Sequence, residues 1–221
     1  MENQRDRLRT DLMSLGLDVS SERLEQLNKF IEEIELWNPI YKLISREEDL
    51  INRHVLDCLA GVNIIRSIAP QRLADVGSGG GFPGVLLAIW MEDTQVCLIE
   101  RSGRRAKFLR DIGMTLNLSN LSIIESPVEK VSLWQSRLKS GMDALFDVIT
   151  FRAWSAINSD ILDSLEKILA PGGTIAAYKG RRVVIDAEIA GINQRLSACE
   201  ISKLVVPGLQ EERHLVLLKL S

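Results

Sequence analysis

The sequence predicts an α/β fold, a doubly wound, mostly parallel sheet of seven strands with a helical extension at the amino terminus. Up to about residue 70, apolar residues recur at helical spacing, as at Leu8, Leu12 and Leu15. After Pro70, short apolar runs alternate with helical segments, which is typical of a parallel sheet covered by helices. We therefore expect a helical extension over residues 1–70 and a second domain over residues 71–221.

The extension is expected to contain three helices. The first ends at Gly16, a common stop signal. The second opens at the serines of positions 20–21 and ends at Pro39. A capping box, Ser45 with Glu48, opens the third.

The third helix carries Arg53, His54 and Asp57 within one turn of each other. One interpretation is a local ion pair beside a half-buried histidine. The other is a lid over a ligand cleft. The spacing around His54 does not match a metal-ligand pattern.

The alternating part of the chain supplies the strands and the helices between them. The strands are expected at Leu73–Val76, Val96–Ile99, Leu121–Ile124, Phe146–Phe151, Thr174–Tyr178, Ile201–Val206 and His214–Leu220. The helices are expected within 82–90, at about 104–116, at 157–169 with a Pro-Gly-Gly terminator, and at 186–196. The short link between the last two strands predicts an antiparallel hairpin.

A glycine-rich turn follows the first strand and leads into a helix, which is the form of a nucleotide-binding βα unit. An acid-x-Gly-x-Gly-x-Gly pattern is formed by Asp75, Gly77, Gly79 and Gly81. This pattern is typical of S-adenosylmethionine-dependent methyltransferases, where the acid lies near the methionine amino group. The dinucleotide pattern G-x-G-x-x-G starts two residues late and puts Pro83 in the helix-opening segment. A nicotinamide enzyme and a turn without ligand remain alternatives.

Ligands of open α/β folds bind at the carboxyl ends of the strands. Glu100 ends the second strand, where an acidic residue commonly holds ribose hydroxyls. Val128 and Glu129 follow the third strand, and Arg152 follows the fourth. We expect these residues to form a cofactor shell together with the glycine turn.

Composition and charge narrow the classes of function. The net charge of −3 gives no global attraction to nucleic acid. Two basic clusters stand out, at positions 101–110 and at Lys179, Arg181 and Arg182, although such clusters can simply be solvated. The three cysteines lie far apart, so we expect neither a disulfide framework nor a metal site. The polar amino terminus and the lack of a long apolar run predict a cytoplasmic protein without a signal peptide.

Hydrolase, metalloprotease and kinase motifs are missing from the sequence: there is no Ser-His-Asp order, HExxH, Walker loop or paired-carboxylate motif. Methyl transfer to a ring nitrogen with a free lone pair needs no base to remove a proton first. It needs the acceptor aligned with the methyl group and shielded from water. Positioning of this kind supplies roughly 7–11 kcal/mol.

Several short motifs together resemble a known family. They are Trp37-Asn38-x-x-Tyr41, Arg53-His54-x-Leu56-Asp57, the turn from Asp75 to Gly84 with its Gly-Phe-Pro-Gly end, Phe146-Asp147, Arg152-Ala153, Lys179-Gly180 and Glu212-Arg213-His214-Leu215-Val216. Their order is that of the glucose-inhibited division protein B family. The resemblance runs from about Leu27 to the carboxyl terminus.

The resemblance implies a class I S-adenosylmethionine-dependent methyltransferase fold and a defined activity. Members methylate N7 of a guanine in the decoding-region loop of 16S ribosomal RNA. The implied cofactor contacts are Gly77, Phe82, Val128, Glu129 and Arg152, with Asp75, Gly79, Gly81 and Glu100 added from the glycine pattern and the second strand. The implied RNA side holds Arg104, Arg105, Lys179 and Arg181, to which we add Arg53, His54 and Arg182.

Arg152 is expected to orient the cofactor or the acceptor base, because a guanidinium cannot act as a general base near neutral pH. The expected partner is 16S ribosomal RNA or the small ribosomal subunit, bound by a monomer without metal or membrane.

The sequence departs from the family at three places. Many members have Asn-Leu-Thr after the tyrosine, where this chain has Lys-Leu-Ile-Ser at 42–45. Pro127 replaces an arginine, which puts one RNA or cleft contact in doubt, and Glu100 replaces an aspartate of some members. A methyltransferase for a small molecule or a protein, a nicotinamide-dependent oxidoreductase and a non-enzymatic binding module are the competing hypotheses. The basic clusters favour RNA, since a small-molecule enzyme more often covers its site with apolar residues.

Overall fold

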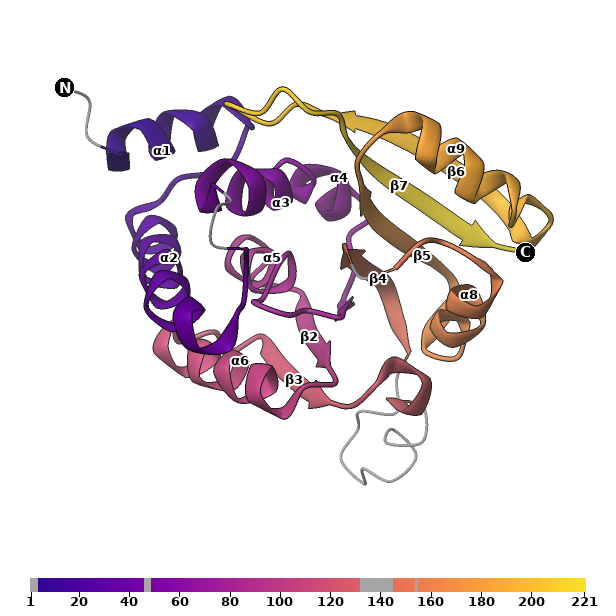
Figure 1. Cartoon of the computed structure of the whole chain (residues 1–221), viewed down its shortest axis with the longest axis horizontal. Coiled ribbons are helices and arrows are strands. Elements are labelled where there is room, and N and C mark those ends of the chain that lie inside the picture. The colour runs from indigo at the N-terminus through magenta and orange to yellow at the C-terminus, as the bar shows by residue number, and fades with distance from the viewer. Residues whose placement is uncertain (1–3, 46–48, 132–144, 154) are drawn as a thin grey trace.

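The computed structural model describes residues 4–45, 49–131, 145–153 and 155–221, which form one seven-stranded sheet with helices on both faces (Figure 1). The strands are β1 (Arg72–Val76), β2 (Gln95–Glu100), β3 (Leu121–Glu125), β4 (Phe146–Arg152), β5 (Leu169–Lys179), β6 (Leu196–Leu204) and β7 (Arg213–Leu220). The helices are α1 (Gln4–Ser14), α2 (Ser21–Tyr41), the π-helix η1 (Ile51–Leu56), α3 (Asp57–Leu59), α4 (Val62–Ser67), α5 (Gly84–Trp90), α6 (Gly103–Thr115), the short η2 (Val128–Lys130), α8 (Ser159–Glu166), α9 (Arg182–Ala190) and the short η3 (Asn193–Arg195).

The strand order is β3-β2-β1-β4-β5-β7-β6. Strands β1 to β5 pair with one another in parallel, and β7 runs antiparallel to both β5 and β6. The order reverses at β1, so the sheet is doubly wound. The predicted fold class and the antiparallel end are therefore confirmed.

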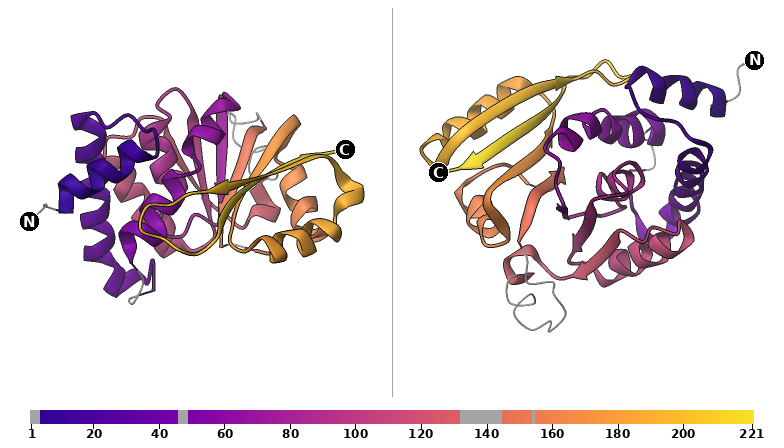
Figure 2. Two further views of the ribbon diagram at one scale, coloured as in Figure 1. Left: turned by 90° about the horizontal axis from the view of Figure 1, so that it is seen from above. Right: turned by 180° about the vertical axis from the view of Figure 1, so that it is seen from behind.

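Alternate residues of the central strands face two separate cores, as the period of a strand requires. Leu73 of β1 packs into the core beneath α2, α5 and α6, whereas the next residue, Ala74, packs into the core beneath α8 and α9. Figure 2 shows these two helical layers on opposite sides of the sheet. The carboxyl ends of β1 to β5 consequently open between the layers, at one edge of the sheet.

The helical extension shares the first of these cores. Leu12 of α1 and Phe30 of α2 are fully buried in the same cluster as residues of α5 and the sheet. The Tyr178 hydroxyl of β5 donates a hydrogen bond to the carbonyl oxygen of Cys58 at 2.8 Å. A Cβ atom at Gly61 would lie 2.5 Å from that hydroxyl, so a glycine is needed for this close approach.

The extension differs from expectation at the end of its second helix. The side chain of Ser20 caps α2, as predicted, but Pro39 lies inside this helix and does not end it. The helix ends at Tyr41, two residues after Pro39. The next residue, Lys42, takes a left-handed conformation with φ of 51°, and its N–H donates to the carbonyl oxygen of Asn38. The predicted capping box cannot be compared, because Glu48 lies outside the described residues.

Three predicted boundaries near the carboxyl terminus are also wrong. The Pro-Gly-Gly segment at 171–173 lies inside β5, where the register with β4 shifts, and therefore does not separate a helix from a strand. Helix α9 begins four residues earlier than predicted, because the backbone N–H of Arg182 donates to Glu212 at 2.9 Å and so caps its start. The predicted end of this helix, Leu196, is the first residue of β6.

Candidate active site

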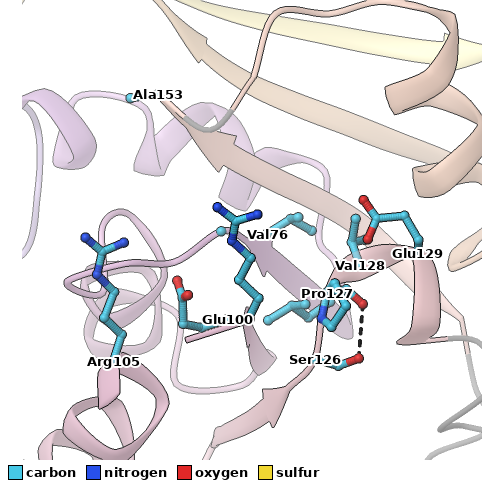
Figure 3. A pocket seen from close by; sticks show the side chains of 11 residues that line it. Val76, Glu100, Arg105, Ser126, Pro127, Val128, Glu129 and Ala153 are labelled. Atoms are coloured by element: carbon cyan, nitrogen blue, oxygen red, sulfur yellow. Dashed lines mark hydrogen bonds between the residues drawn. The ribbon is translucent and has the colours of Figure 1, made fainter. Parts of the chain in front are cut away.

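A pocket of about 330 Å³ lies at the carboxyl ends of β1, β2 and β3; we call it the glycine-turn pocket (Figure 3). Its lining residues are Val76, Gly77, Ile99, Glu100, Arg101, Arg105, Ser126, Pro127, Val128, Glu129 and Ala153. In Figure 3, Glu100 and Arg105 lie on one side of the hollow and Val128 and Glu129 on the other. The structure thus brings together four of the predicted cofactor residues: Gly77, Glu100, Val128 and Glu129.

The turn after β1 has a backbone that only glycine adopts readily. Gly77, Gly79 and Gly81 have φ angles of 72°, 56° and 94°. The N–H of Gly77 donates to the carbonyl oxygen of Ile99 at 2.8 Å, which fastens the turn to β2. A Cβ atom at Gly81 would lie 2.6 Å from Val85, so close packing also requires this glycine.

Glu100 lines the pocket and also holds its rim. One carboxylate oxygen accepts a hydrogen bond from the backbone N–H of Gly79 at 2.9 Å, and the other accepts from Ser102 at 2.8 Å. The residue is buried, with 4% of its surface exposed. Each oxygen retains a second lone pair for a ligand, so Glu100 can brace the turn and accept from hydroxyl groups at the same time.

Asp75 lies beneath the turn and is not among the residues that line the pocket. Its Oδ2 accepts a hydrogen bond from the N–H of Gly84 at 3.0 Å, at the start of α5, and its Oδ1 has no partner among the described residues. Burial raises the pKa of this carboxyl from 3.8 to about 7. The geometry therefore gives Asp75 a role in holding the turn against α5.

Phe82 is buried and packs away from the glycine-turn pocket. Its ring centroid lies 5.2 Å from that of Phe30 and 5.3 Å from that of His54. The guanidinium of Arg152 lies 5.6 Å from the centroid of the same ring, within the range of a cation–π interaction. Phe82 therefore contacts Arg152, which lines a second pocket, described next.

A second pocket of about 260 Å³ adjoins the first; we call it the arginine pocket. It is lined by Asp57, Arg152, Ala153, Ser155, Tyr178, Lys179, Gly180 and Arg213. Ala153 lines both pockets. Two hollows that differ in chemistry therefore meet at the residue that follows β4.

Arg152 is held by the π-helix η1. Its Nη1 donates to the carbonyl oxygen of Arg53 at 3.1 Å and to Oδ2 of Asp57 at 3.3 Å, and its Nη2 lies 2.6 Å from Nδ1 of His54. Arg213 reaches the same carboxylate, with Nε 3.2 Å from Oδ1 of Asp57. π-Helical turns are frequent at functional sites. Here η1 directs the Arg53 carbonyl and His54 at the guanidinium, and Asp57, the first residue of α3, is the third group.

The predicted local ion pair on this helix is wrong. Arg53 pairs with Glu211, in the segment that joins β6 to β7, whereas Asp57 points inward to Arg152 and Arg213. The reason is that Asp57 lies on the buried face of the helix, with 3% of its surface exposed. The expected half-buried histidine is also wrong, because His54 is buried, with 8% of its surface exposed.

The predicted RNA-side residues fall into two groups. Arg104 and Arg181 are exposed at the starts of α6 and α9, and Arg182 is exposed but pairs with Asp186. Lys179 and Arg105 are more enclosed. Lys179 pairs with Glu188 at 2.8 Å and donates to the carbonyl oxygen of Ser155, and Arg105 donates to the carbonyl oxygen of Lys42.

Sequence reasoning missed Arg213 and Asp57 as site residues. Arg213 was visible only as part of the Glu-Arg-His-Leu-Val motif, and the partners of Asp57 are remote in sequence. The described residues contain no cluster of His, Cys, Asp and Glu able to hold a metal ion. No helix within the described ranges is long and apolar enough to cross a membrane.

Several solved methyltransferase structures have the same fold. An O-methyltransferase from Bacillus cereus in complex with SAH superposes with a TM-score of 0.61 at 16% identity, covering 86% of this chain and 91% of that one. A tRNA (m1A58) methyltransferase from Aquifex aeolicus gives a TM-score of 0.54 at 14% identity, covering 73% and 68%. At these identities the likeness shows the fold.

Sequence relatives are closer. A protein of Laribacter hongkongensis named ribosomal RNA small subunit methyltransferase G is 36% identical over 220 residues, covering 99% of each chain. A protein of Neisseria meningitidis with the same name is 33% identical over 217 residues, covering 97% of this chain and 98% of that one. The family model described as rRNA small subunit methyltransferase G matches residues 23–216. The chain belongs to the rRNA small subunit methyltransferase G (GidB) family.

Proposed function

We propose that this chain methylates N7 of a guanine in the decoding-region loop of 16S ribosomal RNA, with S-adenosylmethionine as the methyl donor. The observation that carries the proposal is the pair of adjoining pockets that meet at Ala153, in a chain of this family. One pocket has the glycine turn and the acidic residue of a nucleoside site. The other presents two guanidinium groups to an acceptor.

The glycine-turn pocket fits the cofactor. S-adenosylmethionine supplies an electrophilic methyl group on a sulfonium when it is bound. Glu100, at the end of β2, would accept hydrogen bonds from ribose hydroxyls, and the bare backbone at Gly77 allows close approach. Val128 is buried and would pack against the adenine, with Glu129 beside it.

The arginine pocket fits an acceptor that needs no deprotonation. The lone pair on N7 of a neutral guanine is free, so the transfer needs alignment and exclusion of water. Guanine presents the O6 acceptor beside N7 on the same edge, and arginine is the usual partner of that edge. Arg152 and Arg213 are therefore the residues that we assign to orienting the base, with Arg152 as the catalytic residue.

The RNA phosphates would lie on the exposed basic residues at the same edge of the sheet. Arg104 at the start of α6 and Arg181 and Arg182 at the start of α9 are the most accessible of these. Arg105 reaches both this surface and the glycine-turn pocket. For Arg53, His54 and Lys179 we propose a supporting role, since each has a partner inside the chain.

We further infer a cytoplasmic monomer. Ribosomal RNA is the substrate, and in bacteria it is cytoplasmic. That residues 1–70 and 71–221 form separate folding units stays a prediction.

The test is methyl transfer with the product mapped. Purified protein and methyl-labelled S-adenosylmethionine are incubated with unmethylated 16S RNA and, separately, with small ribosomal subunits. Label in one guanine at N7 supports the proposal. Label in a protein or a small molecule, or affinity for nicotinamide cofactors without methyl transfer, would overturn it in favour of one of the other classes of enzyme.

A further inference from the structure

A single buried carboxylate in the arginine pocket serves two arginines from distant parts of the chain. Asp57 comes from the helical extension, Arg152 from the end of β4 and Arg213 from the start of β7. The distances are 3.3 Å from Nη1 of Arg152 to Oδ2 and 3.2 Å from Nε of Arg213 to Oδ1. The side chains are 5%, 16% and 20% exposed for Asp57, Arg152 and Arg213, respectively.

The two guanidiniums would repel each other without this carboxylate. Burial strengthens both the attraction and the repulsion, because screening by water is weak there. One carboxylate against two guanidiniums leaves one positive charge at the wall of the pocket. That charge suits an oxygen acceptor on the entering base.

The contacts of the two arginines are asymmetric. Arg152 is fastened by the Arg53 carbonyl, His54 and Asp57, and stacks over Phe82. Arg213 makes its side-chain contacts through Nε to Asp57 and through Nη1 to the carbonyl oxygen of Glu212. Its Nη2 has no hydrogen-bond partner within the described part of the chain, and Arg213 lines the pocket. Asp57 therefore fixes the orientation of Arg213, whose Nη2 remains available as a hydrogen-bond donor.

We propose that Asp57 is a positioning residue for the methyl acceptor, holding Arg152 and Arg213 side by side so that Arg213 donates to an oxygen of the base. The inference rests on the proposed function, because it assigns the acceptor to the arginine pocket. Asp57 itself does not touch the reacting atoms. It acts through the two arginines.

The first test is Asp57→Asn, which keeps the shape and removes the charge. We expect the single-turnover rate of methyl transfer to small ribosomal subunits to fall about 100-fold, the size of effect that a misplacement of about 1 Å can have. The dissociation constant for S-adenosylhomocysteine should change less than threefold, because Asp57 does not line the glycine-turn pocket. Asp163→Asn is the matched control, since Asp163 also pairs with an arginine, Arg195, but at the surface on α8.

The second test separates positioning from general support of the fold. In an Arg213→Met background, Asp57→Asn should lower the rate much less than it does in the wild-type chain, because the donor that Asp57 positions is already gone, whereas two independent effects would multiply. Thermal unfolding of the wild-type chain, the two single variants and the double variant shows whether the losses of stability combine differently from the losses of rate. Equal loss of rate in both backgrounds would overturn the proposal.

A third variant covers the case in which Asp57→Asn does not fold. Asp57→Glu keeps the charge balance and moves the carboxylate by one methylene group. Positioning predicts a loss of rate of about tenfold or more with cofactor affinity retained. A wild-type rate in Asp57→Glu would overturn the proposal. Methyl transfer by the unmodified protein tests the proposed function separately, so the two failures are distinguishable.

Discussion

At the scale of single residues, Gly77 combines a left-handed backbone with a place in the lining of the glycine-turn pocket. Its φ of 72° is unfavourable for any residue with a Cβ atom, and it lines the glycine-turn pocket. Gly172 has a similar φ of 74°, but a Cβ atom there would meet nothing within 4 Å. Both glycines therefore have a left-handed backbone, but only Gly77 lines the glycine-turn pocket.

The pair gives a controlled prediction. Gly77→Val and Gly172→Val should both lose stability from the left-handed backbone, by roughly 1–2 kcal/mol. Gly77→Val alone should lose measurable binding of S-adenosylmethionine, because its side chain would occupy the turn. Calorimetry with the cofactor and urea unfolding measure the two effects. Equal cofactor affinity in both variants would contradict the assignment of the turn.

Asp75 makes a second prediction, about stability and pH. Burial raises its pKa from 3.8 to about 7, so between these values the folded chain keeps a proton that the unfolded chain releases. The contribution of Asp75 to the free energy of unfolding is then fully present below about pH 4. It is lost as the pH rises to about 7, by up to roughly 4 kcal/mol. Asp75→Asn cannot ionise, and its free energy of unfolding should decline less across this range. Urea unfolding at pH 5 and pH 8 measures the difference, and an unchanged decline would argue against a neutral Asp75.

At the scale of elements, the starts of α6 and α9 lie near the same edge of the sheet. Helix α6 begins soon after β2 ends, and α9 begins soon after β5 ends. Because β2 and β5 belong to the same set of parallel strands, their carboxyl ends meet at one edge. Basic residues separated by some 75 positions in sequence can therefore face one RNA backbone.

This arrangement predicts a change in salt dependence. Replacing Arg104, Arg105, Arg181 and Arg182 by glutamine should weaken RNA binding and flatten its dependence on salt, by about one unit of slope or less per lost phosphate contact. Cofactor affinity should stay the same for the α9 pair. Lys219→Gln is the control, because Lys219 is exposed near the far end of β7. Filter binding across a salt series measures the slope, and a wild-type slope would assign these arginines to the solvated surface.

Sequence patterns predicted the elements unevenly, for physical reasons. The strand at 96–99 was clear because a buried parallel strand is apolar on both faces. The Pro-Gly-Gly segment misled because these residues form breaks between elements and bulges within strands equally well, and only the register with β4 shows which is present. The start of α9 depends on Glu212, which lies 30 residues away and cannot be seen in a local window.

The residues of the candidate site were also predicted only in part. Gly77, Glu100 and Val128 follow strand ends, so the rule for open α/β sheets places them together. The roles of Asp57 and Arg213 depend on contacts between segments that only the folded chain brings together. The sequence contains many arginines that could pair with a carboxylate on a helix. Which of them lie beside Asp57 is determined by the fold, which buries this side chain.

At the scale of the whole molecule, the pockets that we assign to the cofactor and to the acceptor lie in different halves of the sheet. The glycine-turn pocket belongs to β1, β2 and β3, and the arginine pocket to β4, β5 and β7. The helical extension contributes Asp57 from across the sheet edge and is tied to β5 through Tyr178. The extension is therefore part of the acceptor side.

This division predicts how the rate depends on pH. If the acceptor is guanine N7, no side chain must lose a proton, and the single-turnover rate at saturating cofactor should be nearly flat between about pH 6.5 and 8.5. Rapid-quench measurements of methyl transfer across this range test it. A steep rise with one titration near neutrality would indicate a required base and a ring amine or hydroxyl acceptor.

Ala153 stands where the two pockets meet, in a left-handed conformation with φ of 51°. Its side chain is a single carbon, so a larger side chain here would enter the space that we assign to the transfer. Ala153→Leu is expected to let cofactor and RNA bind with affinities within about fivefold of normal while blocking transfer, which needs reacting atoms about 3–3.5 Å apart. Binding assays beside a transfer assay measure this. In a cell that also makes the ordinary protein, such a variant would act as a decoy, occupying ribosomal RNA and leaving it unmodified in proportion to its abundance.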